Sequence, residues 1–162
     1  MIRPWYWPKG GQPHRTEPFT WIIKGKMAAS WWPDPSVMKK YVEEGINVIV
    51  NASEFDYGAD ISELFTYYHI DIPDFGIPTD SQIEHFLEIT DRHNYMGDPI
   101  AVHCVAGCGR TGQLIVVWAA HNGYIPENTD PVSWIRNIRK CCLETREQVN
   151  FAMEKVQQYR SS

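Results

Sequence analysis

The chain has 162 residues, of which 43% are hydrophobic and 22% charged, and these values fit one globular domain and exclude a disordered chain. Its formal net charge of -5 argues against a nucleic-acid binder that works through a general positive field. The first ten residues lack the apolar core of a signal peptide, and the longest apolar run, Leu114 to Ala120, is too short to cross a bilayer. We therefore expect a cytoplasmic protein that has no membrane partner.

Residues 1–18 differ in composition from the rest of the chain. They contain four prolines, the Gly10-Gly11 pair and three consecutive aromatic residues, Trp5 to Trp7. Because each proline removes an amide donor and restricts the residue before it, we expect no regular structure here. Three adjacent aromatic rings are costly to leave in water, so we expect them to pin this arm to the body of the protein. The predicted organisation is an arm of residues 1–18 and a single domain of residues 19–162.

From Phe19 onward, strand-like and helix-like stretches alternate. Short apolar or alternating patterns predict strands at residues 19–24, 46–51, 68–72 and 99–103. Helix starts are indicated at Asp34-Pro35-Ser36, with Gly45 at the end of that helix, and at the capping-box pattern of residues 79–82. Apolar spacing predicts three more helices, around residues 114–120, 132–138 and 149–156. This alternation predicts an α/β fold with a central, mostly parallel β-sheet flanked by helices.

The segment Ile100 to Gly112, with the sequence IAVHCVAGCGRTG, is the most informative part of the chain. A predicted strand ends at His103, a glycine-rich loop follows, and an apolar helix begins near Arg110. In open α/β sheets, ligands bind where strands end and helices begin, and inward-pointing amides at a helix N-terminus attract anions. Arg110 adds a planar charged fork suited to two phosphate oxygens. The loop therefore predicts an oxyanion site.

Gly107, Gly109 and Gly112 also form a G-x-G-x-x-G pattern between a strand and a helix. A dinucleotide site would need a second parallel strand ending in an acid about 20 residues further on, whereas a turn and helical patterns follow here. That interpretation also gives Cys104 and Arg110 no role, so we reject a Rossmann-type oxidoreductase. No lysine follows the glycines, which excludes a nucleotide-binding P-loop.

A cysteine nucleophile inside an anion cradle accounts for every residue of the loop. We expect the positive surroundings of Cys104 to favour its thiolate, moving the thiol pKa from about 8.5 into a range of roughly 3.5–7.5. Arg110 and the loop amides would offset the repulsion between this thiolate and a bound dianion. Thr111 is placed to donate its hydroxyl to the sulfur. The substrate-binding loop is Cys104, Val105, Ala106, Gly107, Cys108, Gly109 and Arg110.

The pattern His103-Cys104-x-x-Gly107-x-x-Arg110-Thr111-Gly112 resembles the signature of the cysteine-dependent protein tyrosine phosphatases. In length and flanking sequence the chain resembles small archaeal tyrosine phosphatases and atypical dual-specificity phosphatases, over roughly residues 21–159. The resemblance implies the α/β fold of that family and hydrolysis of phosphomonoesters through a phosphocysteine. It implies no metal ion and no organic cofactor. The substrate it implies is a phosphorylated protein or peptide, with phosphotyrosine favoured. It also implies that phosphate and other oxyanions inhibit the protein, and that the protein is a monomer.

The leaving oxygen needs a proton, which a carboxylic acid on a second loop would supply. The segment from Ile72 to Pro78 lies between a strand and a capped helix and resembles the general-acid loop of the family. We assign the acid to Asp74, because Asp71 lies within the predicted strand and Asp80 is better placed as a helix cap. Without the cysteine loop, Asp74 would be only a turn aspartate.

The residues around Gln148 resemble a family segment that carries a water-positioning glutamine, and a solvated helix residue is the equal alternative. The family usually shows Arg-Pro-Gly upstream, whereas here Arg139 is followed by Lys140-Cys141-Cys142. Glu54 follows a strand at a place where related proteins often carry an acid near the pocket, and it is the weaker candidate. His103 is expected to be buried and hydrogen-bonded, orienting the loop and tuning Cys104.

The remaining cysteines have less specific roles. Without a secretion signal, thiol chemistry or burial is favoured over a disulfide framework. We expect Cys108 to line the pocket as a small apolar group, the alternative being a disulfide that traps an oxidised Cys104. Cys141 and Cys142 are expected to be buried. The spacing of His103, Cys104 and Cys108 does not fit a zinc site.

The sequence therefore predicts a protein tyrosine phosphatase, with dual specificity as an open possibility. Two alternative functions are compatible with the motif: a related phosphatase acting on phosphoinositides or RNA 5′ ends, and a non-catalytic phosphate-binding module. Uncharged side chains at Val105, Ala106 and Cys108 argue against the first, because relatives that act on phosphoinositides tend to carry lysine in this loop. The presence of Cys104, Arg110, Thr111 and Asp74 argues against the second.

Overall fold

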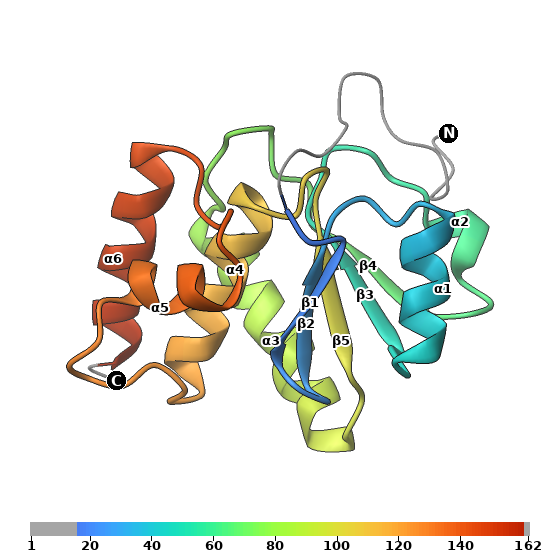
Figure 1. Cartoon of the computed structure of the whole chain (residues 1–162), viewed down its shortest axis with the longest axis horizontal. Helices are drawn as coiled ribbons and strands as arrows, with labels where there is room; N and C mark the ends of the chain where they lie inside the picture. Colours follow the sequence, from blue (N-terminus) through green and yellow to red (C-terminus); the bar gives the residue numbers. More distant parts are fainter. Residues whose placement is uncertain (1–15, 161–162) are drawn as a thin grey trace.

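The computed structural model describes residues 16–160, and Figure 1 shows the course of the chain. Five strands and six helices follow one another as β1 (Phe19–Ile23), β2 (Met27–Ser30), α1 (Pro35–Glu43), β3 (Val48–Asn51), α2 (Gly58–Ile61), β4 (Thr66–His69), α3 (Asp80–Met96), β5 (Ile100–His103), α4 (Gly109–His121), α5 (Pro131–Ile138) and α6 (Arg146–Arg160). No helix within this range is both long enough and apolar enough to span a membrane.

The five strands form one sheet in the order β1-β2-β5-β3-β4. Only the β1–β2 hairpin is antiparallel, and β2, β5, β3 and β4 pair in parallel. Helices α1 and α2 lie on one side of the sheet and α3 to α6 on the other (Figure 1). The predicted α/β fold with a mostly parallel sheet is confirmed, and β5 lies at its centre.

The core divides into two layers because successive strand residues point to opposite faces. Val50 and Val102 pack into the cluster beneath α3, α4 and α6, whereas Ile49 and Ala101 pack into the cluster beneath α1. Every residue of β2, β3 and β5 is buried, as expected for parallel strands covered on both faces. The end of β5 is therefore held rigidly in the middle of the protein.

The predicted helix starts are present. The Asp34 side chain caps α1, and Gly45 follows that helix with a φ of 76°. Thr79 and Gln82 form the reciprocal capping box of α3. The prediction for Asp80 is wrong, because Thr79 is the cap and Asp80 begins the helix, where its Oδ1 lies 2.6 Å from Lys155 Nζ.

Three details depart from the predictions. Strand β2 was not predicted, because its sequence, MAAS, lacks β-branched and aromatic residues. The strand expected at residues 68–72 is β4 at Thr66–His69, since its register is set by pairing with β3. In the helix predicted around residues 149–156 from its apolar spacing, Met153 is one of the apolar residues, yet it is 43% exposed. The buried residues of α6 are Gln148, Phe151, Ala152 and Val156.

Of the N-terminal arm, the structure describes residues 16–18. Its aromatic residues, for which we expect contact with the body, lie outside the described residues. The last part of the arm is attached to the domain: Trp31 N donates to Pro18 O, and Arg139 Nη1 donates to Glu17 O at 2.7 Å.

Candidate active site

The glycine-rich loop joins the C-terminal end of β5 to the N-terminus of α4, as the sequence predicts. Cys104 begins it and is 2% exposed. Within residues 16–160, no protein acceptor pairs with the backbone N–H groups of Val105, Ala106, Gly107 or Cys108. Four successive amides without a protein partner, next to a helix N-terminus, are suited to bind the oxygens of an anion.

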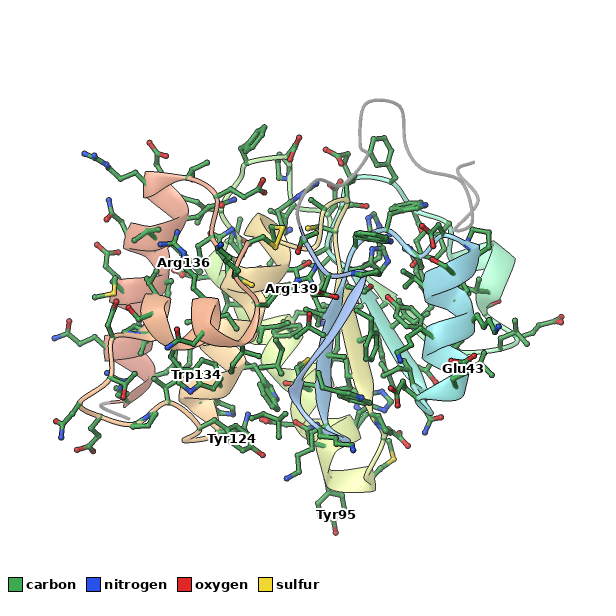
Figure 2. All side chains as sticks on the ribbon, viewed as in Figure 1. Glu43, Tyr95, Tyr124, Trp134, Arg136 and Arg139 are labelled. Carbon is green, nitrogen blue, oxygen red and sulfur yellow. A yellow bond between two sulfur atoms is a disulfide. The ribbon has the colours of Figure 1, made fainter. Side chains whose placement is uncertain are left out.

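The rear of the loop is held by Arg139, a buried residue that Figure 2 labels. Its Nε donates to Gly107 O at 2.8 Å and its Nη2 to Ala106 O at 3.4 Å. Because the C=O and N–H of a trans peptide point in opposite directions, the following amides are directed away from Arg139. Gly107 has a φ of 74°, and a Cβ there would lie 2.2 Å from Ser30 O, so only glycine fits.

Arg110 lies at the centre of the site and is 3% exposed. Its Nη1 donates to Glu54 Oε1 and to Ile72 O, each at 3.0 Å, and its Nη2 lies 3.3 Å from Asp74 Oδ1. Burial acts to lower the pKa of Arg110, but its interactions with Cys104 and Glu54 raise the pKa overall. Glu54, the weaker candidate in the sequence, is therefore a direct partner of Arg110.

The hydrogen bond between Arg110 and Glu54 also determines the protonation state of Glu54. Partial burial raises the pKa of this carboxyl, yet the hydrogen bond and charge of Arg110 lower it more, so that the pKa lies below its ordinary value. Glu54 is therefore a carboxylate that orients Arg110.

Asp74 lies in an exposed turn from Pro73 to Gly76, which Gly76 N closes by donating to Pro73 O at 2.7 Å. Its side chain is 57% exposed and contacts Arg110. Asp80 pairs with Lys155 instead, and the backbone O of Asp71 accepts from Gln82. Of the three aspartates weighed in the sequence, Asp74 is thus the one whose carboxylate the structure places against Arg110.

Gln148 is fully buried, so the alternative of a solvated helix residue is wrong. Its Oε1 accepts from Glu144 N at 2.8 Å and from Thr145 N at 3.2 Å, and its Nε2 donates to Gly76 O at 3.3 Å. A Cβ at Gly109 would lie 2.6 Å from Gln148 Oε1. Gln148 therefore lies between the glycine-rich loop and the loop of Asp74.

Sequence reasoning missed Glu144 as a site residue. Its Oε1 accepts from Gly109 N at 3.2 Å, so a carboxyl group from another segment contacts the glycine-rich loop. Burial and then the charge of Asp74 raise its pKa, despite the opposing effects of Gly109 N and Arg110. Its place in the Glu144-to-Gln148 segment was the one available signal.

The expected contact between Thr111 and the cysteine sulfur is not formed. The Thr111 hydroxyl is buried in the first turn of α4 and has no hydrogen-bond partner within residues 16–160. Because a buried hydroxyl without a partner is costly, this donor is open to a group that binds in the site.

His103 is fully buried behind the loop. Its Nδ1 lies 2.8 Å from Cys104 O, and its Nε2 is hydrogen-bonded to Tyr57 OH. Burial lowers the pKa of His103 to about 3, so the ring is neutral at physiological pH. Tyr57, which sequence reasoning missed, connects His103, the residue before Cys104, to the second core layer.

We expect the free energy of unfolding to decrease on acidification because of His103. Between the unfolded pKa of 6.5 and the folded value of about 3, the unfolded chain binds a proton that the folded protein does not. Stability is therefore lost as the pH falls through this window, by up to about 1.4 kcal/mol per pH unit. Urea unfolding at pH 7 and pH 4.5 measures the effect. His103→Asn should reduce the pH dependence and the exposed control His85→Asn should not, and an unchanged dependence in His103→Asn would contradict the assignment.

The cysteine predictions are wrong for two residues. Cys108 neither lines the pocket as a free thiol nor pairs with Cys104; it forms a disulfide with Cys141, seen as a yellow bond in Figure 2. The two Cα atoms are 5.2 Å apart, within the range that a disulfide spans. Spacing along the sequence could not show this contact, because Arg139 brings the turn after α5 against the loop. Cys104 and Cys142 are free and buried, the latter as expected.

The disulfide should contribute measurably to stability. It closes a sequence separation of 33 residues, for which loop entropy predicts about 3–4 kcal/mol. We expect Cys108→Ser/Cys141→Ser to unfold at a correspondingly lower urea concentration than the oxidised protein. Reductant should destabilise the parent protein and leave the double variant unaffected, and equal midpoints for the two proteins would contradict a formed disulfide.

A model of a protein family, described as "Polymorphic toxin system, DSP-PTPase phosphatase", matches residues 33–124, more than half of the chain. The chain belongs to this DSP-PTPase family. The predicted relationship to the protein tyrosine phosphatase superfamily is therefore confirmed, and the matched range includes both Asp74 and the loop from Cys104 to Arg110.

Sequence relatives come from several organisms. An uncharacterized protein of Methanocaldococcus jannaschii, MJECL20, is 36% identical over 87 residues, covering 53% of this chain and 56% of the relative. Dual specificity protein phosphatase CDC14A of Mus musculus is 31% identical over 140 residues, covering 75% of this chain and 22% of the relative. The chain thus spans about half the length of the first relative and about a fifth of the second.

Solved structures share the fold. The active form of Tk-PTP superimposes with a TM-score of 0.73 at 22% identity, covering 89% of this chain and 97% of the other. PTPMT1 in complex with PI(5)P gives a TM-score of 0.73 at 13% identity, covering 90% and 98%. At these identities the likeness establishes the architecture of the DSP-PTPase chain.

Proposed function

We propose that this protein is a phosphomonoesterase that dephosphorylates phosphotyrosine in proteins or peptides through a phosphocysteine intermediate. One observation carries the proposal: Cys104 opens a loop with four unpaired amides, and the buried Arg110 guanidinium stands beside it, held by Glu54. This arrangement combines a nucleophile, an oxyanion site and a fixed positive charge.

In the first step, Cys104 Sγ attacks phosphorus, and the S–P bond forms as the bond to the leaving oxygen breaks. The loop amides and Arg110 stabilise the negative charge on the equatorial oxygens. Arg110 suits this role because its planar fork binds two oxygens and Glu54 holds it in orientation. Asp74, 3.3 Å from Arg110, donates the proton that the leaving oxygen takes.

In the second step, water attacks the phosphocysteine and gives its proton to Asp74, which releases phosphate and restores the thiolate. Gln148 lies beside Gly109 and near the loop of Asp74, where its amide is suited to position that water. The unpaired hydroxyl of Thr111 is available to the sulfur as it leaves phosphorus.

The side chains of the loop favour a phosphotyrosine peptide over a phosphoinositide. Val105 and Ala106 carry no charge, and Cys108 is committed to its disulfide, so the loop offers no cation besides Arg110. A phosphoinositide headgroup carries further anionic groups that such a loop does not neutralise. We expect free phosphate and other oxyanions to compete for the same amides.

The test measures kcat/KM of the full chain on a phosphotyrosine peptide, the same peptide with phosphoserine, and PI(5)P in mixed micelles. We expect the phosphotyrosine peptide to be preferred. Acid quenching during turnover, followed by peptide mapping, should place the phosphoryl group on Cys104. An adduct on another residue would overturn the mechanism, and a preference for PI(5)P would overturn the substrate assignment.

A further inference from the structure

The turn that carries Asp74 is fastened to α4 at both of its ends. On one side Ile72 O accepts from Arg110 Nη1 at 3.0 Å. On the other side Gly76 O accepts from Gln113 Nε2 at 3.0 Å and from Gln148 Nε2 at 3.3 Å. The residues between these points, 73–75, are exposed, so packing does little to hold Asp74 in place. Its position depends on its own contact with Arg110 and on the hydrogen bonds at the two ends of the turn.

Gln113 is an unusual residue at its position. It is fully buried in α4, and the seven residues that follow it are all apolar and buried. Its Nε2 donates to Gly76 O and also to Gly109 O at 3.2 Å. Both partners are carbonyls, which only accept, so the direction of the amide is fixed.

The other half of the amide has no partner. Gln113 Oε1 is buried and accepts no hydrogen bond within residues 16–160. A leucine or methionine would avoid this cost in an apolar core. The bond that an apolar residue could not replace is the one to Gly76 O, which joins α4 to a loop 37 residues earlier in the chain.

We propose that Gln113 is a positioning residue for the general acid: it holds Gly76 O so that Asp74 stays beside Arg110 and within reach of the leaving oxygen. Gln148 makes a second, longer bond to the same carbonyl, but it also binds the amides of Glu144 and Thr145 at the start of α6. The inference rests on the proposed function, because it concerns the proton that Asp74 delivers.

Loss of Gln113 should therefore impair the reaction only where proton donation matters. For Gln113→Leu we expect kcat/KM to fall by about 10-fold or more on phenyl phosphate, whose leaving group needs the proton. The fall should be much smaller on p-nitrophenyl phosphate, whose leaving group is more acidic. Vanadate binding should be unchanged, because Cys104 and the loop amides remain.

Two further variants separate positioning from a general loss of structure. Thr90→Val removes a buried polar group from α3, away from the site, and should keep the parent ratio of activities on the two substrates. Gly76→Ala disturbs the fastened turn from the other side, because its Cβ would lie 2.6 Å from Pro73 O. Like Gln113→Leu, Gly76→Ala should lower kcat/KM more on phenyl phosphate than on p-nitrophenyl phosphate. If Gln113→Leu fails to fold, Gly76→Ala is used in its place. Adding Gln113→Leu to Asp74→Asn should cause little further loss.

Equal losses of Gln113→Leu on both substrates, or no loss on either, would overturn the inference, as would full additivity with Asp74→Asn. These outcomes are distinct from failure of the proposed function. If Cys104→Ser retained turnover, the phosphocysteine mechanism itself would fail, whereas an inactive Cys104→Ser together with an unaffected Gln113→Leu would reject only the role of Gln113.

Discussion

Cys104→Ser is expected to lose turnover by about 10⁶-fold, the size of effect found when a covalent nucleophile is removed. Serine keeps the size of the side chain but offers a hydroxyl where the reaction needs a thiolate. The amides of residues 105–108 and the Arg110 guanidinium are untouched, so vanadate or tungstate should still bind. Initial rates on p-nitrophenyl phosphate and calorimetric titration with tungstate measure the two properties.

Cys142→Ser is the matched control, because Cys142 is the other free cysteine of the described chain and is fully buried. Burial raises the pKa of the Cys142 thiol to about 12, which keeps it protonated and unreactive. This variant should remain active. Undiminished turnover in Cys104→Ser, or loss of activity in Cys142→Ser with Cys104 intact, would contradict the assignment of the nucleophile.

Asp74→Asn should lower kcat by about 10²–10⁴-fold on phenyl phosphate, the usual contribution of a general acid. Asparagine preserves the shape of the side chain and its carbonyl can still accept from Arg110 Nη2, but it has no proton to give. The loss should shrink as the leaving phenol becomes more acidic. A series of substituted phenyl phosphates measures this dependence.

Asp71→Asn controls for the loss of a nearby charge. Asp71 is exposed, lies three residues before Asp74, and has no contact with Arg110 within the described structure. It should change the rates little on every substrate. If Asp71→Asn and Asp74→Asn lost activity equally, or if the loss in Asp74→Asn were the same for all leaving groups, the proton would come from another group.

The features that local sequence patterns specify were predictable. The Asp34 cap and the Thr79 capping box act within one helical turn, so a few neighbouring residues reveal them. The spacing from His103 to Gly112 likewise fixes a strand end, a loop and a helix start, and the structure places all three there. Asp74 was selected because its loop resembles a known general-acid segment, and the structure places its carboxylate against Arg110.

The features that depend on distant contacts were not predictable from one sequence. Cys108 meets Cys141, and Tyr57 meets His103 46 residues away, only because the sheet and α5 bring them together. From its sequence neighbours alone, Glu144 has the pattern of a surface acid, and Gln113 that of an isolated polar residue in an apolar helix. Their roles follow from hydrogen bonds to groups in other segments, Gly109 N for Glu144 and Gly76 O for Gln113.

The disulfide between Cys108 and Cys141 also joins the glycine-rich loop covalently to the segment between α5 and α6. Opening of the turn before α6 must disturb the loop, since Leu143 N also donates to Cys108 O at 3.2 Å. An oxyanion bound at the loop is thus expected to slow hydrogen exchange in amides of α5 and α6 that it never touches. Hydrogen-exchange rates in α5 and α6 would therefore report whether an oxyanion occupies the loop.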